Sequence, residues 1–285
     1  MIGWFKRRKQ NPKRVLKDAL GQFKLPSFPA VVAEAMRQLR DPNTPLGDIA
    51  QGLMRDPEVS VRLLRLANSP AYSLRHPVGN VQHAMSLLGR AEVESMLLSV
   101  AMKNALPRPR RGCDATRFWQ ASARRAAVAR AIASKTHPAS ASASFTASLL
   151  QEMAVPLLVK ARPKEYLPIR EAWADGKGDL PALEREVLGY DHAVIGAAMC
   201  AEWGFPEELV RSIGGHHHDY GHGDEQVPPA VAIVARLRDI DQEEEDYDVL
   251  VNSIVERLGL PEEEAEELVD DAFDQADEVA AALAA

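Results

Sequence analysis

The first hundred residues of this chain carry apolar side chains every three or four positions, in short stretches that proline or glycine ends. Val32, Ala35, Met36 and Leu39 follow Pro29 at this spacing, which is typical of a helix with one buried face. Similar stretches cover residues 46–54, 59–67, 81–88 and 93–106, and they end at Asp56-Pro57, Asn68-Ser69-Pro70 and Gly89 among others. Segments of this length and period favour packed helices over a sheet.

Longer helical stretches follow after the polar connector 107–112. We expect helices over 118–134, 145–159, 163–175, 181–188, 192–203, 206–216 and 228–240. The small residues 136–144 predict a loop, in which a serine caps the helix that follows. No alternating pattern of useful length predicts a strand, so the fold class is expected to be all-α.

The composition is that of an ordinary globular protein, with 285 residues, 46% hydrophobic and 26% charged. Cys113 and Cys200 provide neither a disulfide framework nor a cysteine-rich zinc motif. No apolar run approaches the roughly 18 residues that would suggest a membrane span. Charged residues follow the only short apolar stretch at the start, unlike a secretory signal. We therefore expect a cytoplasmic protein without a transmembrane segment.

The net charge of −7 conceals a difference between the two ends of the chain. Residues 1–24 contain eight Lys or Arg and one acid, whereas residues 239–285 contain eighteen acids and one Arg. The simplest interpretation is a basic tail and a solvated acidic face. Nucleic-acid binding through the N-terminus and Arg108–Arg111 is an alternative, but an extended basic face is missing, so stable binding is not expected.

The acidic C-terminal segment also carries a continuous apolar stripe at helical spacing. We expect this amphipathic helix to pack on the rest of the chain; the alternative is a docking helix for a basic partner. The stripe comprises Ala265, Leu268, Val269, Ala272, Phe273, Ala276, Val279, Ala280 and Leu283.

Two parts of the sequence together resemble the HDOD family, a branch of the HD superfamily. In the first half they are Leu25-Pro-Ser-Phe-Pro29, the run from Asp56 to Ser69, and His83-Ala-Met-Ser-Leu-Leu-Gly89. The resemblance implies an N-terminal helical lobe over 22–108 and an HD-like helical lobe over 109–240. A basic tail or helix (1–21) and an acidic helical segment (241–285) flank them.

The HD-like lobe departs from the family of metal-dependent phosphohydrolases that it resembles. Gln151-Glu152 takes the place of the adjacent His-Asp pair, and Ala121 stands where such proteins carry their first His. A neutral amide is a weak metal ligand, and a glutamate carboxylate lies one methylene further out than that of aspartate. The resemblance therefore implies a vestigial pocket, formed by Gln151, Glu152, His192, His216, His217 and Asp239.

The run His216-His217-His218-Asp219, with His222 nearby, suggests a metal site by composition alone. Consecutive helical residues point in different directions, so they are not expected to converge on one ion. A polar helix terminus is the simpler interpretation, and no catalytic residue, metal ligand or cofactor is predicted.

By analogy with the family, we expect a non-catalytic bacterial signal-transduction module that acts by binding a protein partner, a small molecule or a nucleotide. The alternative is a metal-dependent phosphohydrolase of nucleotides or cyclic dinucleotides that uses His192, His216, His217 and Asp239.

Overall fold

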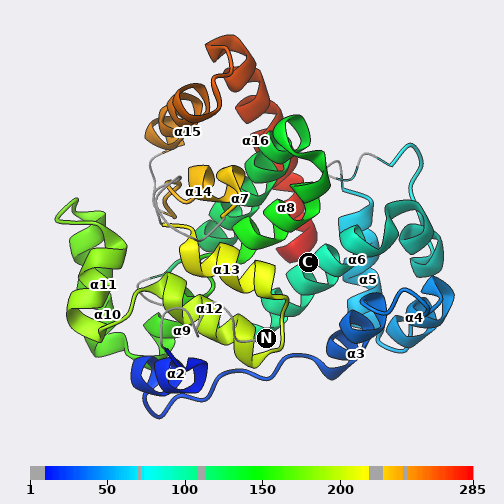
Figure 1. Cartoon of the computed structure of the whole chain (residues 1–285), viewed down its shortest axis with the longest axis horizontal. Helices are drawn as coiled ribbons and strands as arrows, with labels where there is room; N and C mark the ends of the chain where they lie inside the picture. Colours follow the sequence, from blue (N-terminus) through cyan, green and yellow to red (C-terminus); the bar gives the residue numbers. More distant parts are fainter. Residues whose placement is uncertain are drawn as a thin grey trace.

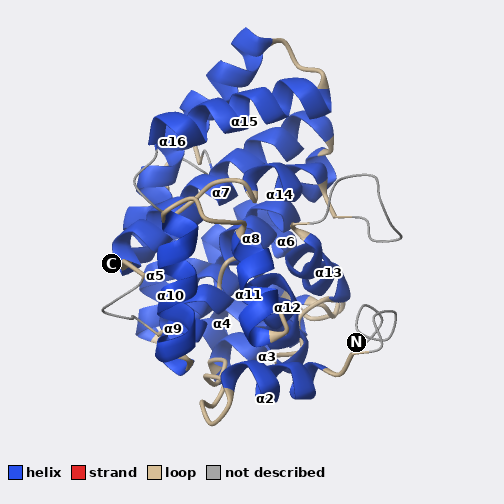
Figure 2. Cartoon of the chain, turned by 90° about the vertical axis from the view of Figure 1, so that its left-hand side faces the viewer, coloured by secondary structure: helices blue, strands red, loops and turns tan. Residues whose placement is uncertain are grey.

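The computed structural model describes residues 10–69, 72, 74–107, 113–217, 227–239 and 243–284. These residues form helices joined by turns and contain no strand, which confirms the all-α prediction (Figures 1 and 2). With the lobes named as in the sequence-based division, the first lobe holds α3 (Ala30–Leu39), α4 (Leu46–Leu53), α5 (Pro57–Ala67) and α6 (Val81–Ala105). The second holds α7 (Ala115–Thr136), α8 (Ala141–Leu150), α9 (Ala154–Ala161), α10 (Pro163–Ala174), α11 (Leu180–Leu188), α12 (His192–Glu202), α13 (Glu207–Gly215) and α14 (Pro229–Val234). The flanking helices are α2 (Pro12–Leu20), α15 (Glu243–Leu258) and α16 (Glu262–Ala284).

Side-chain caps fix the starts of several helices. The carboxylate of Asp56 accepts hydrogen bonds from the backbone N–H groups of Glu58 and Val59, and Pro57 occupies the first turn, where its missing N–H is not needed. Asn80 and Asp114 cap α6 and α7 in the same way. The polar residues before the apolar runs thus define where these helices begin.

Gly89 breaks α6 where the sequence predicts the end of one helix and the approach of another. Its φ of 79° and ψ of 173° are not helical, and a side chain at that position would be strained. Arg90 follows directly, and its guanidinium donates to the backbone oxygens of Leu39 (3.0 Å) and Asp41 (3.2 Å). The kink therefore directs a cation toward the carbonyl groups that α3 leaves unpaired at its C-terminus.

The expected single buried helix over 145–159 is wrong in one respect that matters for function. Residues 151–153 form a turn that separates α8 from α9, so the Gln151-Glu152 pair lies at a helix junction. The predicted loop 136–144 is also wrong in part, because a 3₁₀ turn (Pro138–Ser140) and the start of α8 occupy it. Ser140 does not cap α8 with its side chain; its hydroxyl donates instead to the oxygen of His137. Gln151 and Glu152 are therefore buried inside the second lobe at a turn between two helices.

The helix expected over 228–240 is shorter than predicted. It ends at Val234, and residues 235–239 run as a turn and an extended segment. The oxygen of Leu237, in this segment, accepts a hydrogen bond from Arg125, and the carboxylate of Asp239 accepts from Arg170. These side-chain bonds replace helical backbone bonds and hold the segment against the second lobe.

The long helix α7 lies at the centre of the second lobe, where it packs against α8, α14 and α16. The apolar stripe of α16 is buried on α7 and also reaches α5, which confirms that it packs on its own chain; Leu283 lies outside the residues whose side chains are described. The N-terminal helix α2 packs against α12 and α9 (Figure 1). Both flanking segments therefore belong to the folded body.

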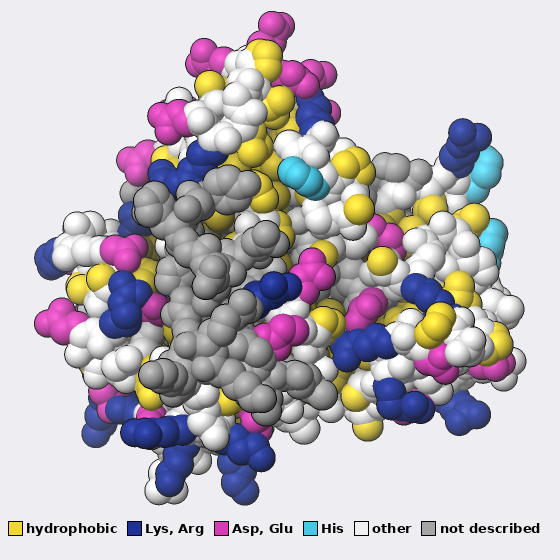
Figure 3. All heavy atoms as spheres, in the orientation of Figure 1, with side chains coloured by type: hydrophobic (Ala, Val, Ile, Leu, Met, Phe, Trp, Pro, Cys, Tyr) yellow, Lys and Arg dark blue, Asp and Glu magenta, His cyan; other side chains and the backbone are white. Residues whose placement is uncertain are grey.

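The stretch Pro138–Ala161 is apolar and long enough to cross a membrane by composition, but 89% of its most apolar window is buried inside the protein. The expectation that no apolar run approaches the length of a membrane span is therefore wrong for this stretch, which belongs to the core as a 3₁₀ turn, α8 and α9. On the face shown in Figure 3, acidic side chains gather over α15 and basic ones over the opposite end near α2. Basic side chains also lie over the first lobe, on the right of this view, so the acidic end over α15 is the more distinct of the two.

Candidate functional site: a cluster of histidines and glutamate

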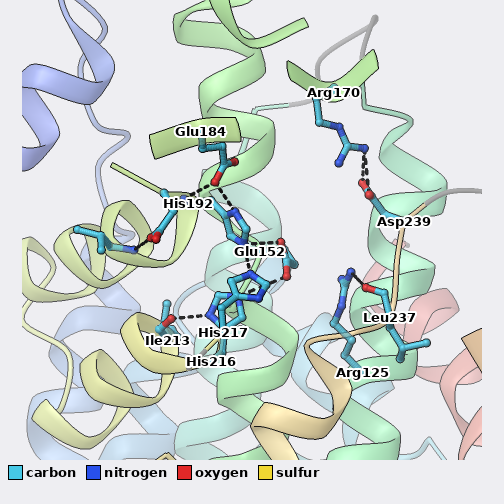
Figure 4. Close-up of polar contacts among 12 residues, drawn as sticks. Arg125, Glu152, Arg170, Glu184, His192, Ile213, His216, His217, Leu237 and Asp239 are labelled. Atoms are coloured by element: carbon cyan, nitrogen blue, oxygen red, sulfur yellow. Dashed lines mark hydrogen bonds and ion pairs between the residues drawn. The ribbon is translucent and has the colours of Figure 1, made fainter. Parts of the chain in front are cut away.

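Three chain segments meet inside the second lobe and bring four possible metal ligands together. Glu152 comes from the α8–α9 turn, His192 from the first residue of α12, and His216 and His217 from the end of α13 (Figure 4). One ligand atom from each residue lies within 4.8 Å of the others. Glu152, His192 and His216 are buried, while His217 is the exposed member. We call this set the His₃Glu cluster.

The ring nitrogens and the carboxylate of the His₃Glu cluster face one another. His192 Nε2 lies 3.1 Å from Glu152 Oε2 and 2.8 Å from His217 Nε2. His216 Nε2 lies 3.5 Å from Glu152 Oε1 and makes no hydrogen bond with the described residues. Three imidazole nitrogens and a carboxylate oxygen thus converge on one point, which is the donor arrangement of a transition-metal site.

The outer ring nitrogens of the cluster are tied to acceptors. His192 Nδ1 lies 2.6 Å from Oε2 of Glu184, and that same oxygen accepts from the backbone N–H of His192 at 2.7 Å. His216 Nδ1 lies 2.6 Å from the backbone oxygen of Ile213, which can only accept, so Nδ1 carries the proton. The Nε2 atom of His216 therefore keeps its lone pair for a metal ion. The hydrogen bonds at Nδ1 would already orient the rings of His192 and His216 for that ion.

Glu184 is itself held in place from the other side. It is fully buried, and its Oε1 accepts a hydrogen bond from the hydroxyl of Tyr166, which is also fully buried. Burial, together with the negative charge of Glu184, raises the pKa of Tyr166 well above its ordinary value, so the hydroxyl stays protonated and donates. The hydrogen bonds that join Tyr166 to Glu184 and Glu184 to His192 are of the kind that orients a metal-ligating histidine.

The charges of the cluster in the metal-free state follow from its pKa shifts. Burial alone would raise the pKa of Glu152, but the charges of His192 and Arg125 and the hydrogen bond from His192 hold it well below its ordinary value. Burial would lower the pKa of His192, but the carboxylates of Glu184 and Glu152 raise it well above the ordinary value. Loss of water around the ring of His217, and the positive charge of His192 beside it, lower the pKa of His217 well below its ordinary value. The proton on His192 then offsets part of the negative charge of Glu152 and Glu184, and a metal ion bound at Nε2 would displace it.

The six residues predicted for the pocket divide into three groups. Glu152, His192, His216 and His217 form the cluster. Gln151 is fully buried, and neither atom of its amide has a hydrogen-bond partner among the described residues. Asp239 accepts two bonds from Nη2 of Arg170, at 2.9 and 3.0 Å, in a pair whose side chains are 9% and 7% exposed. The carboxylate of Asp239 is thus already engaged by a cation.

The argument that consecutive histidines point apart is wrong for His216 and His217. Their ring centroids are 4.0 Å apart, and both rings reach the cluster. His216 still has helical dihedral angles (φ −63°, ψ −20°), but α13 ends at Gly215 and the turn at residues 216–217 places both rings at the cluster. His218, Asp219 and His222 lie outside the described residues.

Two residues of the site were missed at the level of the sequence, Glu184 and Arg125. Both are charged residues at apolar spacing: Glu184 falls between Leu180 and Leu188 on the buried face of α11, and Arg125 lies one turn after Ala121 on α7. A charge at such a position is rarely buried without a partner. That signal is present in the sequence and identifies both residues.

A cavity of about 400 Å³ opens beside the cluster. Glu152, His192 and His217 line it, together with Arg125, Trp173 and Asp239. Arg170 and Arg238 lie over the ring of Trp173, at 4.5 and 4.1 Å from its centroid. The volume lies within the range usual for small-molecule sites.

Several solved structures of bacterial proteins have a fold similar to that of this chain. A solved structure from Shewanella amazonensis SB2B, provisionally named a phosphohydrolase, is 25% identical with a TM-score of 0.74, and the match covers 94% of this chain and 97% of that one. An HDOD domain protein of unknown function from Geobacter sulfurreducens is 22% identical with a TM-score of 0.65, covering 96% and 98%. A provisionally named signal transduction protein from Marinobacter aquaeolei VT8 is 20% identical with a TM-score of 0.69, covering 96% and 66%. The last two likenesses concern the fold alone.

An uncharacterized protein of Treponema pallidum (strain Nichols) is 24% identical over 212 residues. The match spans 74% of this chain but only 41% of that longer relative. The model of the HDOD domain matches residues 25–219, which run from the start of the first lobe through all four residues of the His₃Glu cluster. Since this match covers most of both lobes, the chain belongs to the HDOD family.

Proposed function

We propose that this chain is a non-catalytic regulatory module of bacterial signal transduction, and that its His₃Glu cluster holds one transition-metal ion as a fixed part of a binding pocket. The observation that carries the proposal is the division of the predicted site. Glu152, His192, His216 and His217 supply a complete set of donors for one ion. The residues that would serve a second ion are an alanine, a buried amide and a carboxylate held by Arg170.

The donor set suits a metal that accepts imidazole. Three nitrogen ligands and one carboxylate fit Zn²⁺, and also Ni²⁺ or Fe²⁺, better than Mg²⁺, which prefers oxygen. When bound, such an ion supplies a Lewis acid that polarises a ligand oxygen. Glu184 and the oxygen of Ile213 orient the histidines toward it. The sequence-based expectation of no metal ligand is therefore replaced here by a proposed single-ion site.

Hydrolysis is the competing function. It is favoured by the cavity that opens beside the cluster and by the name of the Shewanella amazonensis relative. Against it stands the loss of the second set of ligands, because HD-type hydrolysis depends on a metal-held phosphate and a metal-activated water in fixed geometry. Ala121 and Gln151 cannot serve as strong metal ligands, so a second ion would lack the side chains to hold the phosphate or to activate the water.

Elemental analysis of protein purified without a His-tag, together with phosphodiesterase assays in added Mn²⁺, Ni²⁺ or Mg²⁺, tests the proposal. We expect close to one transition-metal ion per chain and no turnover above a protein-free blank. The variant Gln151→His with Glu152→Asp is expected to remain inactive, because Ala121 still leaves one ligand missing. Turnover by the unmodified protein that disappears in His192→Ala would establish an enzyme, and metal-free protein would remove the single-ion site.

The partner and the location remain predictions from the sequence. A regulatory module of this kind is expected to pass its signal by contact with a protein partner in the cytoplasm. Pull-down from bacterial lysate with wild type and with His192→Ala would reveal a partner whose binding depends on the cluster, and equal recovery by both would separate partner binding from the pocket.

A further inference from the structure

Arg125 is a buried cation with unused hydrogen-bond donors. The residue is 2% exposed, and Nη2 of its guanidinium donates to the backbone oxygen of Leu237 at 2.6 Å. Its Nε and Nη1 atoms are buried and have no hydrogen-bond partner among the described residues. Burying a charged donor without an acceptor is unfavourable, so this position is best explained if an acceptor arrives from outside the chain.

The surroundings of Arg125 indicate what kind of acceptor fits. Arg125 lines the 400 Å³ cavity together with Glu152, His192 and His217 of the cluster, and Figure 4 shows its guanidinium on the same side as Glu152. Asp239 also lines this cavity, but both of its oxygens accept from Arg170. Arg170 therefore neutralises the carboxylate of Asp239. The charge of Arg125 acts on Glu152, but its Nε and Nη1 atoms keep no hydrogen-bond partner among the described residues.

The charge of the cavity favours an anion. Three arginines of the cavity wall (Arg125, Arg236 and Arg238) face three carboxylates (Glu152, Asp179 and Asp239), and Arg170 already neutralises Asp239 from behind. A divalent ion on the His₃Glu cluster would add two positive charges, so the loaded cavity would be net positive. A guanidinium and a metal ion are both preferred partners of phosphate oxygens. A phosphate group carries its oxygens on a tetrahedron, so separate oxygens can face the metal position and each of the two unused donors of Arg125. A carboxylate has only two oxygens for the same three contacts.

We propose that this cavity binds a phosphate group, with the Nε and Nη1 groups of Arg125 donating to its oxygens and another oxygen facing the metal position of the His₃Glu cluster. The contact with the metal rests on the proposed function; the contact with Arg125 does not. The cavity is larger than a bare phosphate ion, so the group is carried by a larger molecule. Free phosphate and a phosphate ester share this chemistry, and the test separates them.

Calorimetric titration of metal-loaded protein with inorganic phosphate, ribose 5-phosphate and a nucleoside monophosphate tests the proposal. We expect binding of all three, with an ester bound more tightly than free phosphate. Acetate at equal ionic strength is the reference for a non-specific anion. Equal binding of acetate and phosphate, or no binding of any phosphate compound at millimolar concentration, overturns the proposal.

Substitution identifies the residue. Arg125→Gln is expected to weaken phosphate binding about 10- to 100-fold, the usual effect of losing hydrogen bonds to a charged group. The matched control is Arg117→Gln, which removes an exposed arginine from the same helix outside the cavity and should bind like wild type. If Arg125→Gln does not fold, Arg125→Lys retains the charge with fewer donors and is expected to bind with intermediate affinity. Unchanged affinity in a folded Arg125 variant overturns the assignment.

Metal-depleted protein separates this inference from the proposed function. Metal binding without phosphate binding would refute the phosphate site and leave the single-ion site intact. Phosphate binding that depends on Arg125 in a protein that holds no metal would support the phosphate site and refute the single-ion site. The rise in melting temperature that phosphate causes can be measured in metal-loaded and in metal-depleted wild type, which makes the same comparison without any substitution.

Discussion

Glu184 offers the sharpest test of the proposed metal site, because it touches the cluster only through His192. Its carboxylate is fully buried and accepts from Nδ1 and the backbone N–H of His192 and from Tyr166, so no water can replace it. Loss of such a supporting carboxylate typically weakens metal binding about 10- to 100-fold, or about 1.4 to 2.8 kcal/mol. Glu184→Gln keeps an acceptor oxygen but loses the charge, so we expect about a tenfold loss. Glu184→Ala loses both and should approach 100-fold.

The assay is competition for Zn²⁺ against a chromophoric chelator, with circular dichroism to confirm folding. Glu186→Gln, an exposed acid on the same helix, is the control and should bind like wild type. The two carboxylates raise the pKa of His192, and metal must displace that proton. Removing the charge of Glu184 lowers the pKa of His192, so the loss of affinity should be larger at alkaline than at acidic pH. Wild-type affinity in both Glu184 variants would show that the cluster does not bind metal in the arrangement described.

Three further outcomes concern stability. Arg170→Met leaves the buried carboxylate of Asp239 without its cation and should lower the free energy of unfolding by about 3 to 5 kcal/mol in urea titrations, a cost that Arg170→Met with Asp239→Leu should largely remove. Gly89→Ala should cost about 1 to 3 kcal/mol because of its positive φ, whereas Gly52→Ala, in a helix with open space around it, should be neutral or stabilising; equal effects would refute the kink. Burial raises the pKa of Asp246 to about 6 from 3.8, so ionisation destabilises the fold: its contribution to stability is full below the unfolded pKa and is lost as pH rises through about 6. Asp246→Asn should therefore melt above wild type at pH values over 6 and lose that advantage toward pH 4.

Local sequence signals identified the helices reliably where a cap and a period agree. Asp56-Pro57 predicts the start of α5, and the same residues form its cap. The stripe of α16 predicts a buried face, and that face is buried on α7. These predictions succeed because helical period and capping depend on neighbours within one or two turns of the chain.

The sequence was less informative where helices end inside the core. The apolar run 145–159 gives no sign that residues 151–153 form a turn, since both flanking helices are buried on all sides and show no polar face. The length of α14 was overestimated for a related reason. Arg125 and Arg170 hold the segment 235–239 by side-chain bonds, and these arrive from helices more than sixty residues away.

The all-α class and the family could be predicted from the sequence by itself, because these depend on residue identity and local period. The resemblance also implies that Ala121 and Gln151-Glu152 stand where related phosphohydrolases carry a histidine and a His-Asp pair. Only the tertiary structure decided what the remaining residues do. It brought His192, His216, His217 and Glu152 within 4.8 Å, gave Asp239 to Arg170, and set Glu184 behind His192. The physical reason is that a metal site or a buried ion pair is defined by distances between side chains far apart in the chain, and these are fixed by how helices pack and where they stop.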